Sequence, residues 1–330
     1  MHLYFRDKTA FFSEYQNDPL PLEAPAPGEL TPDAVCARLN RYAHRLVPGW
    51  ASRLTAFVDV QQDLLFWLVC GWGEGFSGTV LAYGAWPDQG RAYFTLADAR
   101  PTIQAATGIG SLEGSLWAAL SRLADEVLDR DWPHEGGGAL QIERCLIDSG
   151  WGQSTELVKR FCRQSPFNAI LTPSKGIGIG ASGNPMSEWP RQQGERRGPD
   201  WVLRLPKPGE PRLLLYDANA QKSFCHARLS QPLGEKGALT LFGDNPQVHR
   251  LLADHVCAEY RVRTEGRSRR LDEWKVRPHR PDNHLWDCLV GCCVAASFQG
   301  VTLEGVQSQP RERRQRVSYA VLQAKARGGR

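Results

Sequence analysis

The chain of 330 residues is 42% hydrophobic, which is enough apolar material for the core of one large domain or two small ones, and its net charge of +4 is modest. The longest apolar runs, such as residues 64–70 and 288–298, are far too short to cross a bilayer, and the first residues lack the pattern of a signal peptide. These features argue against a membrane protein and a secreted one, so we expect a soluble cytoplasmic protein with no membrane partner. Nine cysteines without a C-x-x-C pair are expected to be reduced thiols of the core.

The first 50 residues predict a linker and a lead-in helix. The stretch NDPLPLEAPAPGELTP is rich in Pro and acidic residues, the composition of a linker. Residues 31–46 then show helical periodicity, with Thr31 as the N-cap before a proline. We place the main domain at residues 51–300 and a basic C-terminal tail at residues 301–330.

Three consecutive strands open the main domain. The apolar runs at residues 54–60, 64–72 and 78–86 are joined by the short polar turns QQD and GEGFS, which is the pattern of an antiparallel meander.

Helices and strands alternate after the meander. Residues 112–127 carry apolar side chains at helical spacing, residues 139–148 predict a strand, Ser154 caps a second helix, and residues 167–173 predict another strand. This order favours parallel strands in the same sheet. The expected fold is therefore α/β: a mixed sheet of three antiparallel strands followed by parallel strands, flanked by helices.

The last third of the chain is predicted to contain fewer regular elements. Residues 174–200 are rich in Gly, Pro and Arg and predict an irregular loop, residues 201–206 and 212–218 a hairpin, and residues 284–299 the last helix.

Three aspartates share one kind of position, the edge of a core element. Asp59 ends the first strand, Asp148 ends the fourth, and Asp287 lies near the start of the last helix. Each one taken alone is most simply a turn or cap residue. If the three converge, their mutual repulsion calls for cations between them, and oxygen ligands favour Mg²⁺ or Mn²⁺. Two such ions about 4 Å apart would serve phosphodiester cleavage.

At these residues the sequence resembles a known family. The stretches LTAFVDVQ, LIDSGWGQSTELVKRFC, ILTPSKG and EWKVRPHRPDNHLWDCLVGCCVAA are similar, in order and spacing, to the motifs of the nuclease domain of large terminase subunits of tailed bacteriophages, in the lambda-like family. The resemblance implies a ribonuclease H-like fold and metal-dependent cleavage of concatemeric double-stranded viral DNA during packaging. It also implies the terminase small subunit, the ATPase portion and the portal as partners.

The resemblance also assigns roles to single residues. It implies that Asp59, Asp148 and Asp287 bind the metal ions, and that Lys175, in the Lys-Gly after the fifth strand, meets the scissile phosphate. An ordinary loop lysine is the alternative. His284 stands where many family members have a glutamate, and is a metal ligand, a proton shuttle or only a residue of the helix start.

Basic residues are concentrated in two segments. Residues 261–280 contain eight Lys or Arg against three Asp or Glu, and residues 311–330 contain seven against one. Such runs are usually solvated faces, but they also attract nucleic acid. The candidate DNA-binding residues of the first segment are Arg261, Arg263, Arg267, Arg269, Arg270, Lys275 and Arg277.

Other motifs narrow the choice of function. The chain contains no G-x-x-x-x-G-K-[ST], so we expect the packaging ATPase activity to come from elsewhere. GIGASG at residues 178–183 satisfies G-x-G-x-x-G, but the residues after it cannot open the helix that nucleotide binding requires. Two alternatives to a terminase nuclease remain: another ribonuclease H-like enzyme such as a junction resolvase, and an inactive DNA-binding or docking module.

Overall fold

A mixed β-sheet forms the centre of the protein. The computed structural model describes residues 28–205, 210–266, 269–280 and 282–303. Within them, the sheet has nine strands in the order β11-β3-β2-β1-β6-β7-β10-β9-β8. In chain order, these are β1 (Arg53–Val60), β2 (Leu65–Trp72), β3 (Gly78–Trp86), β6 (Ile142–Asp148), β7 (Leu171–Ile177), β8 (Arg196–Gly198), β9 (Trp201–Arg204), β10 (Leu213–Asp217) and β11 (Leu239–Leu241).

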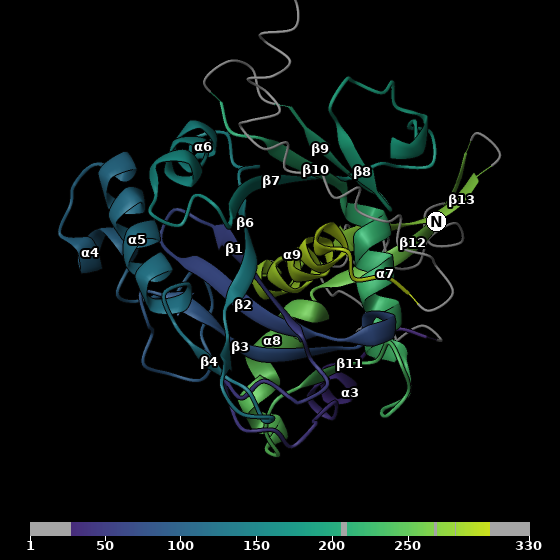
Figure 1. The fold of residues 1–330 in the computed structure, drawn as a ribbon, viewed down its shortest axis with the longest axis horizontal. Coiled ribbons are helices and arrows are strands. Elements are labelled where there is room, and N and C mark those ends of the chain that lie inside the picture. The colour runs from purple at the N-terminus through teal and green to yellow at the C-terminus, as the bar shows by residue number, and fades with distance from the viewer. Residues whose placement is uncertain (1–27, 206–209, 267–268, 281, 304–330) are drawn as a thin grey trace, which may run out of the picture.

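Helices cover both faces of this sheet (Figure 1). On one face lie α4 (Ile103–Thr107), α5 (Leu112–Val127) and α6 (Thr155–Gln164), and on the other lie α3 (Pro32–Cys36), α7 (Ala218–Ser230), α8 (Arg250–Val256) and α9 (His284–Gln299). Two further strand pairs lie outside the sheet, β4 (Trp132–Pro133) with β5 (Ala139–Leu140), and β12 (Glu259–Gly266) with β13 (Arg269–Val276). Single 3₁₀ turns occur at Glu74–Phe76, Met186–Glu188 and Pro246–His249.

Strand pairing confirms the expected mixed sheet. The strands β1, β2 and β3 form the antiparallel meander, and β6 pairs in parallel with β1, with Val58 beside Ile147. Parallel pairing continues through β7 to β10, and β9 returns antiparallel as the predicted hairpin.

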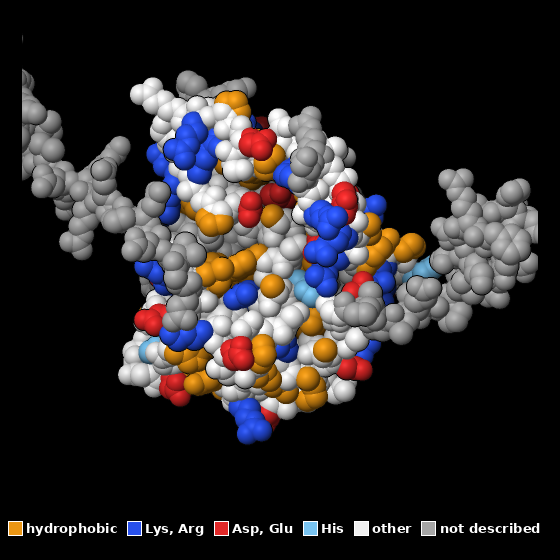
Figure 2. Space-filling model, turned by 90° about the vertical axis from the view of Figure 1, so that its right-hand side faces the viewer, with side chains coloured by type: hydrophobic (Ala, Val, Ile, Leu, Met, Phe, Trp, Pro, Cys, Tyr) orange, Lys and Arg blue, Asp and Glu red, His pale blue; other side chains and the backbone are white. Residues whose placement is uncertain are grey.

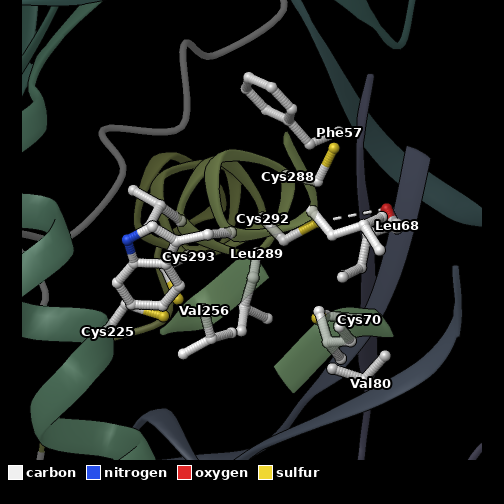
Figure 3. Close-up of a cluster of buried hydrophobic side chains, with 14 of the residues drawn as sticks. Phe57, Leu68, Cys70, Val80, Cys225, Val256, Cys288, Leu289, Cys292 and Cys293 are labelled. Atoms are coloured by element: carbon white, nitrogen blue, oxygen red, sulfur yellow. Dashed lines mark hydrogen bonds between the residues drawn. The ribbon is translucent and has the colours of Figure 1, made fainter. Parts of the chain in front are cut away.

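Nearly every residue of β1 is buried. Side chains alternate across a strand, so both faces of β1 are covered. Ala56 and Val58 belong to the core under α5 and α6, whereas Phe57 packs against α9. The helix α9 is apolar on nearly all sides, and Figure 3 shows Cys288, Leu289, Cys292 and Cys293 of this helix among side chains from the sheet and from α7 and α8. All nine cysteines are buried and free, as predicted.

The lead-in helix is shorter than predicted. Thr31 caps it as expected, accepting a hydrogen bond from the Ala34 N–H, but the helix ends at Cys36 instead of residue 46. The following residues add to the sheet: Leu39 forms a bridge with Leu241, and the Asn40 N–H donates to the Leu241 carbonyl at 2.9 Å. Helical periodicity in this stretch reflects burial against α8 and β11, not a longer helix.

The sequence prediction failed where distant packing decides the structure. The strand expected at residues 167–173 lies at Leu171–Ile177, and α7, α8, β11 and the β12–β13 hairpin were not predicted. The helix α7 buries polar Gln221 and His226 beside Cys225 and Leu229, so its sequence has no clear apolar stripe. The predicted basic tail after residue 303 and the first 27 residues lie outside the described residues.

Candidate active site

Two of the predicted carboxylates lie side by side at one edge of the sheet. The strands β1 and β6 are parallel neighbours, so their carboxyl ends meet, and Asp59 and Asp148 follow directly on the paired residues Val58 and Ile147. Asp59 is only 5% exposed, and Asp148 is partly buried. Both positions belong to the α9 face of the sheet, together with Phe57 and Leu146.

Asp59 is held by two hydrogen bonds to the same carboxylate oxygen. His284 Nδ1 lies 2.8 Å from Asp59 Oδ2, and Gln61 Nε2 donates to it at 2.9 Å. Burial is the largest effect and lowers the pKa of His284, but the hydrogen bond to Asp59 and the charges of Asp59, Asp282 and Asp287 together outweigh it, so the net shift is upward. The His284 ring stacks on Phe66, with centroids 4.6 Å apart. His284 therefore supports Asp59, and Gln61 is a site residue that the sequence analysis missed although it lies in the QQD turn.

Asp148 has weaker support. Among the described residues, only the Gly150 N–H donates a hydrogen bond to it, at 3.1 Å. Burial, and then the negative charge of Asp59, raise the pKa of Asp148 to about 7. The site therefore concentrates negative charge in a place that has little water to screen it.

Tyr216 in β10 is a second unpredicted neighbour of the carboxylates. Its register partner is Gly176 in β7, where an added Cβ atom would lie 3.1 Å from the Tyr216 hydroxyl. The glycine thus leaves room for the ring. Burial, and then the charges of the three aspartates, raise the pKa of the Tyr216 hydroxyl well above its ordinary value.

Asp287 is neutralised by a lysine that the sequence analysis did not single out. Lys222 Nζ in α7 lies 2.9 Å from Asp287 Oδ1 and 2.5 Å from Glu259 Oε1. Asn283 Nδ2 also donates to Glu259 Oε1, at 2.5 Å. Burial opposes the charge of Lys222, but these two carboxylates raise its pKa overall. Lys222 and Glu259 lie in segments for which no element was predicted, so the sequence held no signal for this cluster.

The three aspartates lie near enough to act on one another, because the charges of Asp59 and Asp287 both raise the pKa of Asp148. Among the described residues, no group of three or more His, Cys, Asp or Glu side chains is placed to hold a metal ion. In this structure Asp287 is paired with Lys222, and Asp59 is hydrogen-bonded to His284. The adjacent oxygens of Asp59 and Asp148 have the chemistry that a hard divalent cation requires. A cation there would also offset the repulsion from Asp59 that, after burial, raises the pKa of Asp148.

Lys175 lies at the same edge but on the other side of the strand. In β7 it falls between Ser174 and Gly176, and alternation sends its exposed side chain away from the α9 face. It contributes only the last and smallest effect on the pKa of Asp148.

The predicted DNA-binding residues lie in or beside the β12–β13 hairpin, and many have partners within the protein. Asp272 lies 3.7 Å from both Arg261 and Arg263, Glu265 lies 2.6 Å from Arg270, and Arg277 lies 3.1 Å from Glu29. Arg263, Arg270 and Lys275 are exposed, and Arg267 lies outside the described residues. Figure 2 shows the same mixture on one face of the molecule, where acidic side chains lie between separate groups of Lys and Arg.

Arg269 has a structural role instead of an exposed one. Its Nη2 donates to the carbonyls of Gly180, Ala181 and Gly183, and Glu273 accepts a hydrogen bond from the Ala181 N–H at 3.2 Å. The hairpin therefore clamps the GIGASG segment. Residues 178–185 are irregular and are followed by a single 3₁₀ turn, as the sequence predicted for this loop.

Comparison with known proteins now decides the family. Residues 24–309 match the family model described as terminase large subunit gpA, endonuclease domain. The chain belongs to this family. A mutant nuclease domain of the large terminase subunit gp2 of bacterial virus Sf6, with manganese, is a similar solved structure: it is 11% identical, with a TM-score of 0.40 over 74% of this chain and 89% of that one.

Two further findings concern this gpA-family endonuclease domain. No curated protein matches the chain. Among the helices that the structure describes, none is long and apolar enough to cross a membrane.

Proposed function

We propose that this domain is a metal-dependent endonuclease that cleaves concatemeric double-stranded viral DNA during genome packaging. One observation carries the proposal: Asp59 and Asp148 are adjacent at the carboxyl ends of parallel strands, where burial and mutual repulsion raise the pKa of Asp148 to about 7. Burying two carboxylates together is costly, and a divalent cation is the usual means of offsetting that cost in an enzyme.

Asp59 and Asp148 are the residues that would hold Mg²⁺ or Mn²⁺. A bound pair of such ions supplies an activated water and stabilises the leaving oxygen of the phosphodiester. His284 fixes the Asp59 carboxylate through a 2.8 Å hydrogen bond. Asp287 would contribute as a third ligand after its carboxylate turns away from Lys222, with which it is paired in this structure.

The exposed cations of the hairpin are the proposed contacts to the DNA backbone. Arg263, Arg270 and Lys275 can reach phosphates, whereas Arg269 is committed to the GIGASG carbonyls. In this proposal the terminase small subunit, an ATPase portion and the portal deliver the DNA in the host cytoplasm. We assign Lys175 a contact with the DNA backbone at the edge of the sheet, and not a contact with the scissile phosphate.

Nicking of supercoiled plasmid tests the proposal. With Mn²⁺ or Mg²⁺ the wild-type protein should nick the plasmid, and EDTA should stop the reaction. Asp59→Asn and Asp148→Asn should each reduce the rate by at least about a hundredfold, because each removes a charged metal ligand. Asp125→Asn, an exposed aspartate of α5, is the matched control and should leave the rate unchanged.

Cleavage of other substrates and DNA binding by the same proteins separate the alternatives. Equal rates for wild type and both site variants would remove Asp59 and Asp148 from the mechanism. Preference for branched over linear duplex would favour a junction resolvase, and absence of cleavage with intact DNA binding would favour a docking module.

A further inference from the structure

A cleft lies beside the candidate active site and is not part of it. It has a volume of about 420 Å³ and is formed by the loop around Tyr93, by α8 and by the segment before α9. This volume is within the range of about 300–1,000 Å³ that small-ligand sites occupy. Its side chains combine aromatic and charged groups, chiefly Tyr93, Arg250, Asp254, His279, Arg280 and Asp282.

Tyr93 offers a rigid aromatic surface in this cleft. The residue is 48% exposed, yet its hydroxyl donates to Asp254 Oδ2 at 2.9 Å. Arg250 Nε donates to the same oxygen at 3.1 Å and so fixes the carboxylate. A ring held in this way loses little conformational entropy when a flat ligand stacks on it.

The positive groups of the cleft are more available than the negative ones. Asp254 is engaged by Tyr93 and Arg250, and Asp282 Oδ2 accepts a hydrogen bond from the Leu96 N–H at 2.7 Å. By contrast, the side chains of Arg280 and His279 make no hydrogen bond or ion pair with the residues that the structure describes. The cleft therefore presents free cationic or donor groups beside a flat ring.

One wall is shared by the cleft and the catalytic edge. Phe94 of the cleft stacks on Phe66 at 6.1 Å, and His255 lies 6.1 Å from His284, measured between ring centroids. Phe66 is in turn the register partner of Asp59. The cleft thus opens on the β2 side of Asp59, opposite to Asp148.

We propose that this cleft binds one unpaired nucleotide of the DNA strand that passes the cleavage site, with its base on Tyr93 and its phosphate at Arg280. This inference rests on the proposed nuclease function and adds a subsite to it. A base within a duplex is stacked on its neighbours and cannot reach a ring inside a cleft, so the ligand has to be unpaired. Stacking on an aromatic ring is also tolerant of sequence, because every base has a π-face.

Binding of two oligonucleotides in EDTA tests the subsite without any cleavage. One is a blunt duplex, and the other is the same duplex with a single-stranded extension. Tyr93→Ala should weaken binding of the extended duplex by about tenfold, since stacking contributes about 1–3 kcal/mol per base. Binding of the blunt duplex should not change. Tyr93→Phe keeps the ring but loses the hydrogen bond to Asp254, so it should bind the blunt duplex as the wild type does and the extended duplex more tightly than Tyr93→Ala does.

Arg280→Gln gives an independent measurement. It should weaken binding of the extended duplex and lower its salt slope by about one phosphate, close to 0.7 for a single strand. The proposal is overturned if Tyr93→Ala leaves binding of the extended duplex unchanged, or weakens both duplexes equally while thermal unfolding shows an intact fold.

The outcomes remain separable from the nuclease proposal. If Tyr93→Ala does not change binding of the extended duplex but the protein nicks plasmid normally, the subsite alone is ruled out. If Tyr93→Ala weakens binding of the extended duplex but the wild-type protein never nicks plasmid, the nuclease function is ruled out and a single-strand binding site remains.

Discussion

At the scale of single residues, the three aspartates of the site differ in their hydrogen-bond and ion-pair partners. Asp59 has His284 and Gln61 as hydrogen-bond partners, Asp287 has Lys222, and Asp148 has a backbone N–H from Gly150. Asp148 is therefore the carboxylate whose ionisation is least compensated, and its pKa is the one raised to about 7. This difference leads to two predictions about stability.

The first prediction concerns Asp148→Asn in metal-free buffer. The folded-state pKa of Asp148 is about 7, above the ordinary 3.8, so the wild type should lose stability as the pH rises between these values, and the loss should level off above about pH 7. Asparagine has no charge to bury, so the variant should be more stable at pH 8, on the order of 2 kcal/mol. Urea unfolding from pH 4 to pH 8.5 measures the difference. A difference between the proteins that does not grow with pH would contradict this account.

The second prediction concerns Lys222→Met. The change leaves Glu259 and Asp287 without their shared cation, and removal of one partner from a buried ion pair costs about 3–5 kcal/mol. Arg270→Gln is the control, because its pair with Glu265 is exposed and should contribute less than about 1 kcal/mol. Free energies of unfolding in urea compare the two. Similar small losses in both variants would show that the Lys222 cluster does not stabilise the fold.

At the scale of elements, α9 determines where the site residues lie. The helix carries His284 and Asp287 in its first turn, and its packing on β1 brings them to the sheet edge. Gly291 permits the close approach: an added Cβ atom would lie 1.8 Å from Phe57 Cδ2. The position of Phe57 two residues before Asp59 links this packing contact to the site.

Gly291→Ala should therefore destabilise the protein by about 3 kcal/mol or more, since overpacking at such a contact forces the helix or the strand to move. Gly152→Ala is the matched control, because its added Cβ atom would meet nothing within 4 Å. Thermal and urea unfolding give the comparison. If the two variants are equally stable, the contact between α9 and β1 is looser than described.

Local sequence patterns predicted some elements and not others, for a physical reason. The meander, α5, α6 and α9 have hydrophobic periodicity or an apolar run that is visible within one segment. The helix α7 and the β12–β13 hairpin are instead determined by neighbours far along the chain, such as Asp287 for Lys222 and the GIGASG carbonyls for Arg269. The basic segment suggested a DNA track, but Arg269 binds the GIGASG carbonyls and four other arginines have acidic partners within the protein, namely Arg261, Arg263, Arg270 and Arg277.

At the scale of the whole molecule, sheet topology explains how much of the site was predictable. The sequence placed Asp59 and Asp148 at the ends of two strands, and the parallel pairing of β1 with β6 brings these ends together at one edge of the sheet. The pairing of Asp287 with Lys222 joins α9 to α7, and no pattern in the sequence specifies that contact. The family match over residues 24–309 agrees with the sequence resemblance and supplies what topology alone does not, the class of enzyme.

The central claim is that the carboxyl ends of β1 and β6 form a divalent-metal site. Titration of Mn²⁺ into the protein, followed by electron paramagnetic resonance, measures this directly. The wild type and Asp125→Asn should bind Mn²⁺ with the same affinity, and Asp59→Asn and Asp148→Asn should each lose more than about tenfold. Equal Mn²⁺ binding by all four proteins would contradict the claim.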